Sequence, residues 1–402
     1  MNTRWLSAVA GLVAVAALAG TAFANAPMKV TVKTVTPVKT IPLRDLQYVN
    51  LPPIMRRIIG DARFSQRQIN QLYNKLIQEG YLQRASGQFA IHNPWKKPAL
   101  SQAPRVQDRA IQTKLYGPQP NSITAGQAFP GIGASNTPPD SVGCEPPDTD
   151  MAVGANDVVE LVNLCEGSGT GYFKAWNKLT GAVIQNTTSL SGMWGANSGC
   201  DQGGGDNMVL YDQLANRWIM SQLNNLDDGI CVAISETGDP TGAYYLYNFP
   251  IVASGSLSDY PKVAVWPDAY YVSTNDFEDF SYFEHVDFTA LDRSAMLTGS
   301  AATMIIINGQ DNGLDYSVLP ADLDGMTPPP ANDPGIFVNF GSPYESGTPY
   351  ALNFWRMHVD FANPDSSTLS GPVSLAVDAF NDGICGGGLG GGCIPQPSGA
   401  EG

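Results

Sequence analysis

Four aspartates recur at the start of similar segments: Asp150, Asp206, Asp259 and Asp315, at intervals of 56, 53 and 56 residues. Carboxylates repeated at a fixed period come together at one end of a repeat architecture. There they would hold a metal cation or a positively charged group of a ligand. The alternative is that each aspartate ends a loop and accepts hydrogen bonds from nearby backbone amides.

Calcium is the one cofactor for which the sequence offers candidates; otherwise we expect none. The first is Asp311-Asn-Gly-Leu-Asp315, with Asp311 and Asp315 as ligands, and the second is Asp322-Leu-Asp324. Neither matches the twelve-residue calcium loop, so solvated turns are the alternative. A zinc site of cysteines and histidines is not favoured, because Cys-x-x-Cys is absent and the three histidines lie far apart in sequence.

Aromatic and nucleophilic residues leave open whether the protein is an enzyme. Trp194 lies in a glycine-rich loop and is a candidate ligand contact, whereas Trp218, Tyr244 and Tyr271 fall within strand patterns and should pack between sheets. There is no Gly-x-Ser-x-Gly motif. Glycosidase chemistry needs only two carboxylates at a set separation, and the sequence selects no pair.

The elements that must position these residues are short strands. From Cys144 onward, apolar segments of strand length alternate with turns, and each aspartate-led segment begins a set of them. Pro267-Asp268, between two apolar runs, indicates a hairpin. A period of this length with strand content is typical of a β-propeller of four-stranded antiparallel blades. We predict an all-β fold with about four blades over residues 141–380 and a glycine-rich tail over 381–402.

The N-terminus predicts export. An uncharged apolar run after Arg4 ends in Ala22-Phe-Ala24, as in a secretory signal peptide over residues 1–24. An uncleaved anchor is the alternative, and no later run is long and apolar enough to span a membrane. We therefore expect the protein to be secreted, periplasmic or bound to the cell envelope.

The cysteines agree with export, since six of them follow the signal peptide and an even number favours disulfides in an exported chain. Proximity in sequence suggests the pairs Cys144–Cys165, Cys200–Cys231 and Cys385–Cys393.

Charge divides the chain in two. Residues 27–116 hold 15 Lys and Arg against 4 Asp and Glu, whereas the rest from Gly117 holds 6 against 33. An acidic domain of this kind repels nucleic acid, so we expect no nucleic-acid partner. The basic segment, residues 25–92, begins with extended structure or linker over 30–51 and includes an amphipathic helix at about 65–79; a linker follows over 93–140. For the basic segment four roles are open: it would dock on the acidic part, act as a pro-segment, bind an anionic surface or stay solvated.

Several motifs together resemble a family of large secreted bacterial proteins with propeller-like repeats. They are Cys144-Glu-Pro-Pro-Asp-Thr-Asp150, Val209-Leu-Tyr-Asp-Gln-Leu-Ala-Asn-Arg-Trp218, Ile234-Ser-Glu-Thr-Gly-Asp-Pro-Thr-Gly242 and the segment Asp259 to Tyr271. The resemblance implies export and a propeller, and it assigns no activity or site residue. Members usually continue beyond the motif Cys393-Ile-Pro-Gln-Pro397 into further blades, so we expect that this chain does not complete the ring.

The sequence thus favours an extracellular binding or interaction module for a glycan or protein ligand. The competing class is a carbohydrate-active hydrolase or lyase that uses the recurring aspartates, which a propeller would place near one mouth of its central channel.

Overall fold

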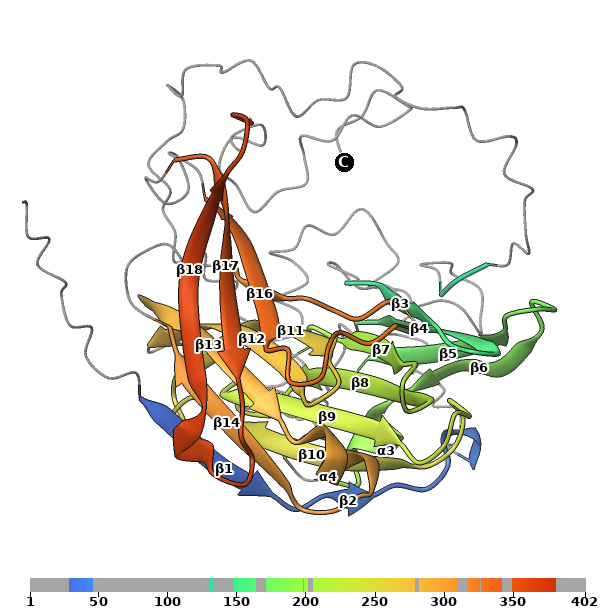
Figure 1. Cartoon of the computed structure of the whole chain (residues 1–402). Helices are drawn as coiled ribbons and strands as arrows, with labels where there is room; N and C mark the ends of the chain where they lie inside the picture. The colour runs from blue at the N-terminus through green and yellow to red at the C-terminus, as the bar shows by residue number, and fades with distance from the viewer. Residues whose placement is uncertain are drawn as a thin grey trace, which may run out of the picture.

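The computed structural model describes residues 29–45, 130–132, 148–163, 171–197, 199–201, 205–278, 282–309, 317–325, 327–341 and 349–380. This part of the chain is all-β, as predicted, and forms four antiparallel sheets (Figure 1). Its helices are short: α3 (Ser191–Trp194), α4 (Arg293–Leu297), η1 (Leu43–Asp45) and η2 (Pro364–Ser366). Among these residues no helix has the length and apolar character needed to cross a membrane. The predicted helix at 65–79 lies outside the described residues.

Each sheet is built from strands that follow one another in the chain, as the repeat predicted. Sheet 1 holds β3 (Asp150–Val153), β4 (Asp157–Val162), β5 (Tyr172–Asn177) and β6 (Val183–Ser189). Sheet 2 holds β7 (Met208–Asp212), β8 (Arg217–Leu223), β9 (Gly229–Ser235) and β10 (Tyr244–Pro250). Sheet 3 holds β11 (Leu257–Val265), β12 (Tyr270–Glu278), β13 (Tyr282–Leu291) and β14 (Ala302–Asn308). Sheet 4 holds β15 (Leu319–Pro320), β16 (Gly335–Gly341), β17 (Ala351–His358) and β18 (Thr368–Ala376).

The hairpin predicted at Pro267-Asp268 joins β11 to β12. The Trp266 amide donates to the Ala269 carbonyl at 3.1 Å, and the Tyr271 hydroxyl donates to the Asp268 carboxylate. Proline presets one dihedral angle of such a turn, and the aspartate side chain stabilises it.

Both faces of the inner sheets are apolar, and they pack against the neighbouring sheets. All seven residues of β9 are buried. Phe173 of sheet 1 shares one apolar cluster with Trp218 of sheet 2. Tyr247 of sheet 2 shares a second with Val272 of sheet 3, and Phe288 of sheet 3 shares a third with Phe337 of sheet 4. Because strand residues alternate between faces, each sheet supplies side chains to two clusters.

The N-terminal stretch that the sequence marked as extended or linker forms strands of the sheets. β1 (Val30–Val35) pairs antiparallel with β14, and β2 (Val38–Lys39) pairs with β10, so sheets 3 and 2 each gain a fifth strand along their outer edge (Figure 1). Leu43, in η1, is buried in the cluster between sheets 1 and 2. Residues 30–43 therefore lie across two consecutive sheets.

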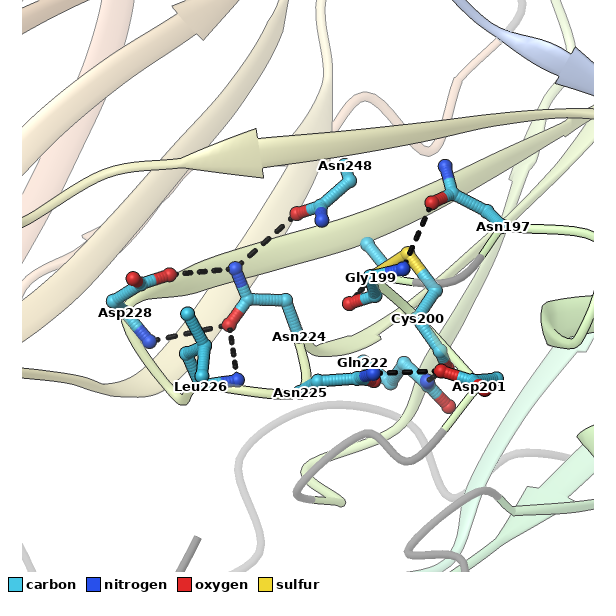
Figure 2. Close-up of a disulfide and its surroundings, with 11 residues drawn as sticks. Asn197, Gly199, Cys200, Asp201, Gln222, Asn224, Asn225, Leu226, Asp228 and Asn248 are labelled. Carbon is cyan, nitrogen blue, oxygen red and sulfur yellow. Dashed lines mark hydrogen bonds between the residues drawn. A yellow bond between two sulfur atoms is a disulfide. The ribbon is translucent and has the colours of Figure 1, made fainter. Parts of the chain in front are cut away.

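The predicted disulfide Cys200–Cys231 is present and ties the loop after α3 to β9 (Figure 2). Around it, Gln222 donates to the Cys200 carbonyl at 2.8 Å and Asn224 donates to Asp228 at 2.7 Å. Disulfides are typical of proteins outside the reducing cytosol. The other four cysteines, Cys144, Cys165, Cys385 and Cys393, lie outside the described residues.

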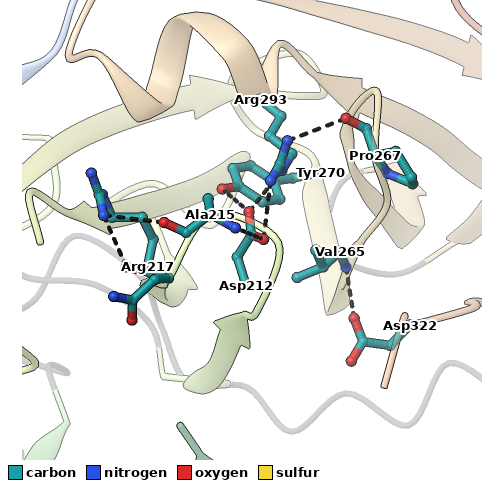
Figure 3. A network of polar contacts seen from close by, with 9 residues as sticks. Asp212, Ala215, Arg217, Val265, Pro267, Tyr270, Arg293 and Asp322 are labelled. Carbon is teal, nitrogen blue, oxygen red and sulfur yellow. Dashed lines mark hydrogen bonds and ion pairs between the residues drawn. The ribbon is translucent and has the colours of Figure 1, made fainter. Parts of the chain in front are cut away.

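A buried ion pair joins sheets 2 and 3 (Figure 3). The Arg293 guanidinium donates to both carboxylate oxygens of Asp212, at 2.7 and 3.0 Å, and the Tyr270 hydroxyl donates to the same carboxylate at 2.8 Å. Asp212 is fully buried at the end of β7, and the amide of Ala215 also donates to it. The carboxylate is therefore satisfied only by groups from both sheets.

We expect Arg293→Met to lower the free energy of unfolding by about 3 kcal/mol, because it leaves the buried Asp212 carboxylate without its cation. Urea unfolding of the variant and the wild type measures this difference. Arg356→Met, at an exposed position of β17, is the matched control and should change stability by less than about 0.5 kcal/mol. Equal unfolding midpoints for the two variants would show that the pair does not join the sheets.

Candidate ligand site

The first strands of successive sheets are neighbours: β3 contacts β7, β7 contacts β11, and β11 contacts β15. Asp150 begins β3, Asp206 stands two residues before β7, and Asp259 lies near the start of β11. The structure thus places three of the four predicted aspartates at the same end of adjacent strands. We call Asp148, Asp150, Asp206, Asp259 and Lys262 the acidic mouth. Asp315, like Asp311, lies outside the described residues.

Asp150 accepts hydrogen bonds from backbone amides, as expected if the aspartates serve the fold. Its carboxylate accepts from the amide of Met151 at 2.9 Å and from the amide of Val209 at 2.8 Å. The second bond reaches the next sheet, so this aspartate fixes β7 against β3.

Asp206 and Asp259 have a different electrostatic character. Burial, with the charges of Asp259 and Asp148, raises the pKa of Asp206 to about 7, and Lys262 opposes the rise. Burial also raises the pKa of Asp259. A carboxyl group with a pKa near 7 carries a proton through much of the physiological range, so it can donate as well as accept a hydrogen bond.

Lys262 is the cation around which the mouth is organised. Burial lowers the pKa of its ammonium group, whereas Asp206, Asp150, Asp148 and Asp259 all raise it. Its Nζ also lies 3.6 Å from the centre of the Tyr260 ring, in a cation–π contact. One ammonium group is therefore under the electrostatic influence of four carboxylates.

The backbone repeats an unusual conformation at this end of the sheets. Asp148, Asp206, Tyr260 and Ser317 have φ values of 37°, 53°, 52° and 52°, in the left-handed region. Each stands two residues before the point where its strand begins or resumes regular pairing, at Asp150, Met208, Lys262 and Leu319. Residues other than glycine rarely adopt this conformation, and they cluster at functional sites. Sequence reasoning missed this feature because the four residues are of three different types.

Asparagines of the preceding sheet support these turns. Asn163, just after β4, accepts from the side-chain amide of Asn207 at 2.7 Å and donates to Asp148 at 2.6 Å. Asn275 of β12 accepts from the amide of Ser317 at 2.9 Å. Sheet 1 thus helps to position the first turn of sheet 2, and sheet 3 helps to position that of sheet 4.

Two other candidates serve the protein itself. Trp194 is fully buried in α3, among the apolar residues between sheets 1 and 2, so its ring offers no exposed face to a ligand. Asp322 accepts from the amide of Val265 at 2.7 Å and so fastens the chain after β15 to the end of β11 (Figure 3).

The structure also assembles a polar cluster that the sequence did not single out: Asp276, His285, Asp287 and Asn308 of sheet 3. His285 Nε2 lies 3.5 Å from Asp276 Oδ2 and 3.3 Å from Asp287 Oδ1. The segment His285-Val-Asp287 could have indicated half of this cluster, because alternate residues of a strand share a face. Asp276 and Asn308 lie on neighbouring strands, and the sequence does not show which of their residues stand opposite His285 and Asp287.

No protein-family model and no curated protein matches this chain. Solved structures give low similarity. A subtype N10 neuraminidase-like protein of A/little yellow-shouldered bat/Guatemala matches at 9% identity and a TM-score of 0.31, over 55% of this chain and 57% of that one. An exo-β-1,3-galactanase from Clostridium thermocellum matches at 14% identity and 0.31, over 56% and 48%.

A GH62 hydrolase in complex with xylotriose matches at 10% identity and a TM-score of 0.29, over 52% of this chain and 64% of that one. This chain spans less than two thirds of the length of each of these three proteins. Similarity at this level assigns no function.

The pKa of Asp206 predicts a pH effect on stability. Above its ordinary pKa of 3.8 the unfolded chain loses this proton, whereas the folded chain keeps it up to about pH 7. The contribution of Asp206 to stability therefore falls as pH rises across this window. Asp206→Asn cannot ionise, and asparagine tolerates the left-handed backbone. We expect it to raise the melting temperature more at pH 7.5 than at pH 4.5.

Thermal unfolding of both proteins across this pH range is the measurement. Asp227, whose pKa burial and its neighbours raise to about 6, acts in the same direction in both proteins and cancels in the comparison. The exposed Asp365→Asn is the control and should shift the curve equally at all pH values. A pH-independent effect of Asp206→Asn would contradict the assignment.

Proposed function

We propose that this chain is an exported binding module in which the four sheets are the blades of an incomplete β-propeller, and that the acidic mouth binds a positively charged group of an extracellular ligand. The observation that carries the proposal is that the four aspartates of the acidic mouth act electrostatically on one lysine, Lys262, at the same end of adjacent first strands. Excess carboxylate over ammonium leaves the mouth able to bind a further cation.

Exposed apolar residues support the incomplete ring. Met151 and Val153 of sheet 1 are 58% and 52% exposed, and Val373 and Leu375 of sheet 4 are 69% and 58% exposed. Inner sheets bury the equivalent faces against neighbours, so further blades or another chain would cover these positions.

Export is supported by the apolar leader, by the Cys200–Cys231 disulfide and by the resemblance to large secreted proteins. The secreted, periplasmic or cell-envelope location is part of the proposal. So is docking of the basic N-terminal segment on the acidic sheets, which the pairing of β1 and β2 with β14 and β10 supports.

The ligand we favour is a cationic sugar or a lysine-rich peptide. Tyr260 is 48% exposed beside Lys262 and offers a flat ring to such a ligand. Carboxylates then pair with the ammonium groups.

A second candidate, a carbohydrate-active hydrolase, is favoured by one observation. Asp206 keeps its proton near neutral pH and interacts with Asp259 across the mouth. A carboxyl group that stays protonated beside a second carboxyl group is what a general acid and its partner require. In this alternative Asp206 would protonate the leaving oxygen.

The test compares chitosan oligosaccharides, which carry free amines, with their N-acetylated counterparts, which do not. We expect the wild type to bind the amine form, and Asp206→Asn/Asp259→Asn to weaken this binding about tenfold or more. Calorimetry measures the affinity of the wild type and of the double variant for each sugar, with Asp365→Asn as the control. A lysine-rich peptide is the probe for a protein ligand.

Unchanged binding in the double variant would reject the acidic mouth as the ligand site. Release of reducing ends by the wild type, lost in Asp206→Asn, would establish the hydrolase in place of the binding module.

A further inference from the structure

The polar cluster of sheet 3 is fixed by strand register. Asp276 of β12 stands opposite His285 of β13, and Asp287 of β13 stands opposite Asn308 of β14. His285 and Asp287 are two residues apart on one strand and face the same side. The Asp276 and Asp287 side chains are 1% and 2% exposed, and that of His285 is 22% exposed. The imidazole is therefore the side of the cluster that solvent reaches.

The polar side-chain atoms of this cluster lie close to one another. Asn308 Nδ2 lies 2.6 Å from Asp287 Oδ1 and 2.7 Å from His285 Nε2, so with the amide in this orientation Nε2 accepts and carries no proton. The lone pair of Nε2 and two carboxylate oxygens then share one space; the candidate ligand atoms of Asp276, His285 and Asp287 all lie within 4.8 Å of one another.

Asp276 Oδ2 gives independent support for a bound cation. It is buried and accepts no hydrogen bond in the described structure, whereas the other oxygen of this carboxylate accepts from Thr274 at 3.1 Å. Its 3.5 Å separation from His285 Nε2 is longer than a hydrogen bond. A buried carboxylate oxygen without a partner is costly, and a cation among the three atoms would remove that cost.

We propose that Asp276, His285 and Asp287 bind a divalent transition metal ion, with zinc as the best fit. Zinc bonds of about 2.0–2.2 Å to nitrogen and oxygen place neighbouring ligands of a tetrahedron about 3.3–3.6 Å apart. The two distances from Nε2, 3.3 and 3.5 Å, match this spacing.

The donor set also selects the metal. An imidazole nitrogen suits zinc and its neighbours in the first transition row, whereas calcium takes oxygen ligands. Three protein ligands leave a fourth position for water or a ligand atom, as in catalytic zinc sites. Asn308 would turn aside on binding, since its amide nitrogen and the ion compete for the same lone pairs, and the terminal torsion of asparagine is soft.

The test titrates zinc chloride into the full mature chain after treatment with a chelator, using calorimetry. We expect saturable binding of one ion at this site, a higher melting temperature with zinc, and loss of both in His285→Ala. His358→Ala is the matched control, because His358 is an exposed strand histidine of the same chain, and it should bind zinc as the wild type does.

Cobalt substitution provides a spectroscopic readout. A four-coordinate site gives strong visible absorption, which should disappear in Asp287→Asn, a variant of nearly unchanged shape that decides the question if His285→Ala does not fold. The proposal is overturned if the wild type shows no saturable zinc binding, if His285→Ala or Asp287→Asn binds as tightly as the wild type, or if calcium displaces zinc.

Discussion

The structure depends on one constraint: each inner sheet has two apolar faces, and neither can remain in water. Burial of apolar surface contributes about 25 cal/mol per Å². The four main strands of each sheet are consecutive in the chain, and β1 and β2 extend sheets 3 and 2, but the faces of an inner sheet become buried only when it packs between its neighbours. The three apolar clusters satisfy this requirement pairwise, from sheet 1 to sheet 4. This packing brings the first strands side by side and so creates the acidic mouth.

Polar contacts add the precision that apolar packing lacks. At one end of β7, Asp212 binds Arg293 and Tyr270 of the next sheet. At the other end, Asn163 bonds to Asp148, the left-handed residue before β3, and to Asn207, which follows the left-handed Asp206 before β7. An apolar interface alone would tolerate small sliding motions, whereas directional bonds fix the height of each strand relative to the next.

The sequence predicted local features well and long-range features poorly. Alternating residues and turn signals such as Pro267-Asp268 predicted the strands, because these patterns depend on a few neighbours in the chain. The alternation of Val and Thr over residues 30–35 indicated extended structure, but its pairing with β14 depends on residues more than 250 positions away. The polar cluster escaped prediction for the same reason: only the register brings Asp276 opposite His285.

The small number of lysine and arginine side chains determines which carboxylates are free to take part in binding or catalysis. From Gly117 onward, 6 basic side chains face 33 acidic ones, so few buried aspartates can have an arginine or lysine of their own. Asp212 has Arg293 and is wholly committed to structure. Asp206, at the other end of β7, has no cation of its own: Lys262 acts on it and on three other carboxylates, and Asp206 retains a proton near neutral pH. The same shortage leaves the buried Asp276 and Asp287 facing an imidazole, and a proton or a metal ion between these groups would balance the charge.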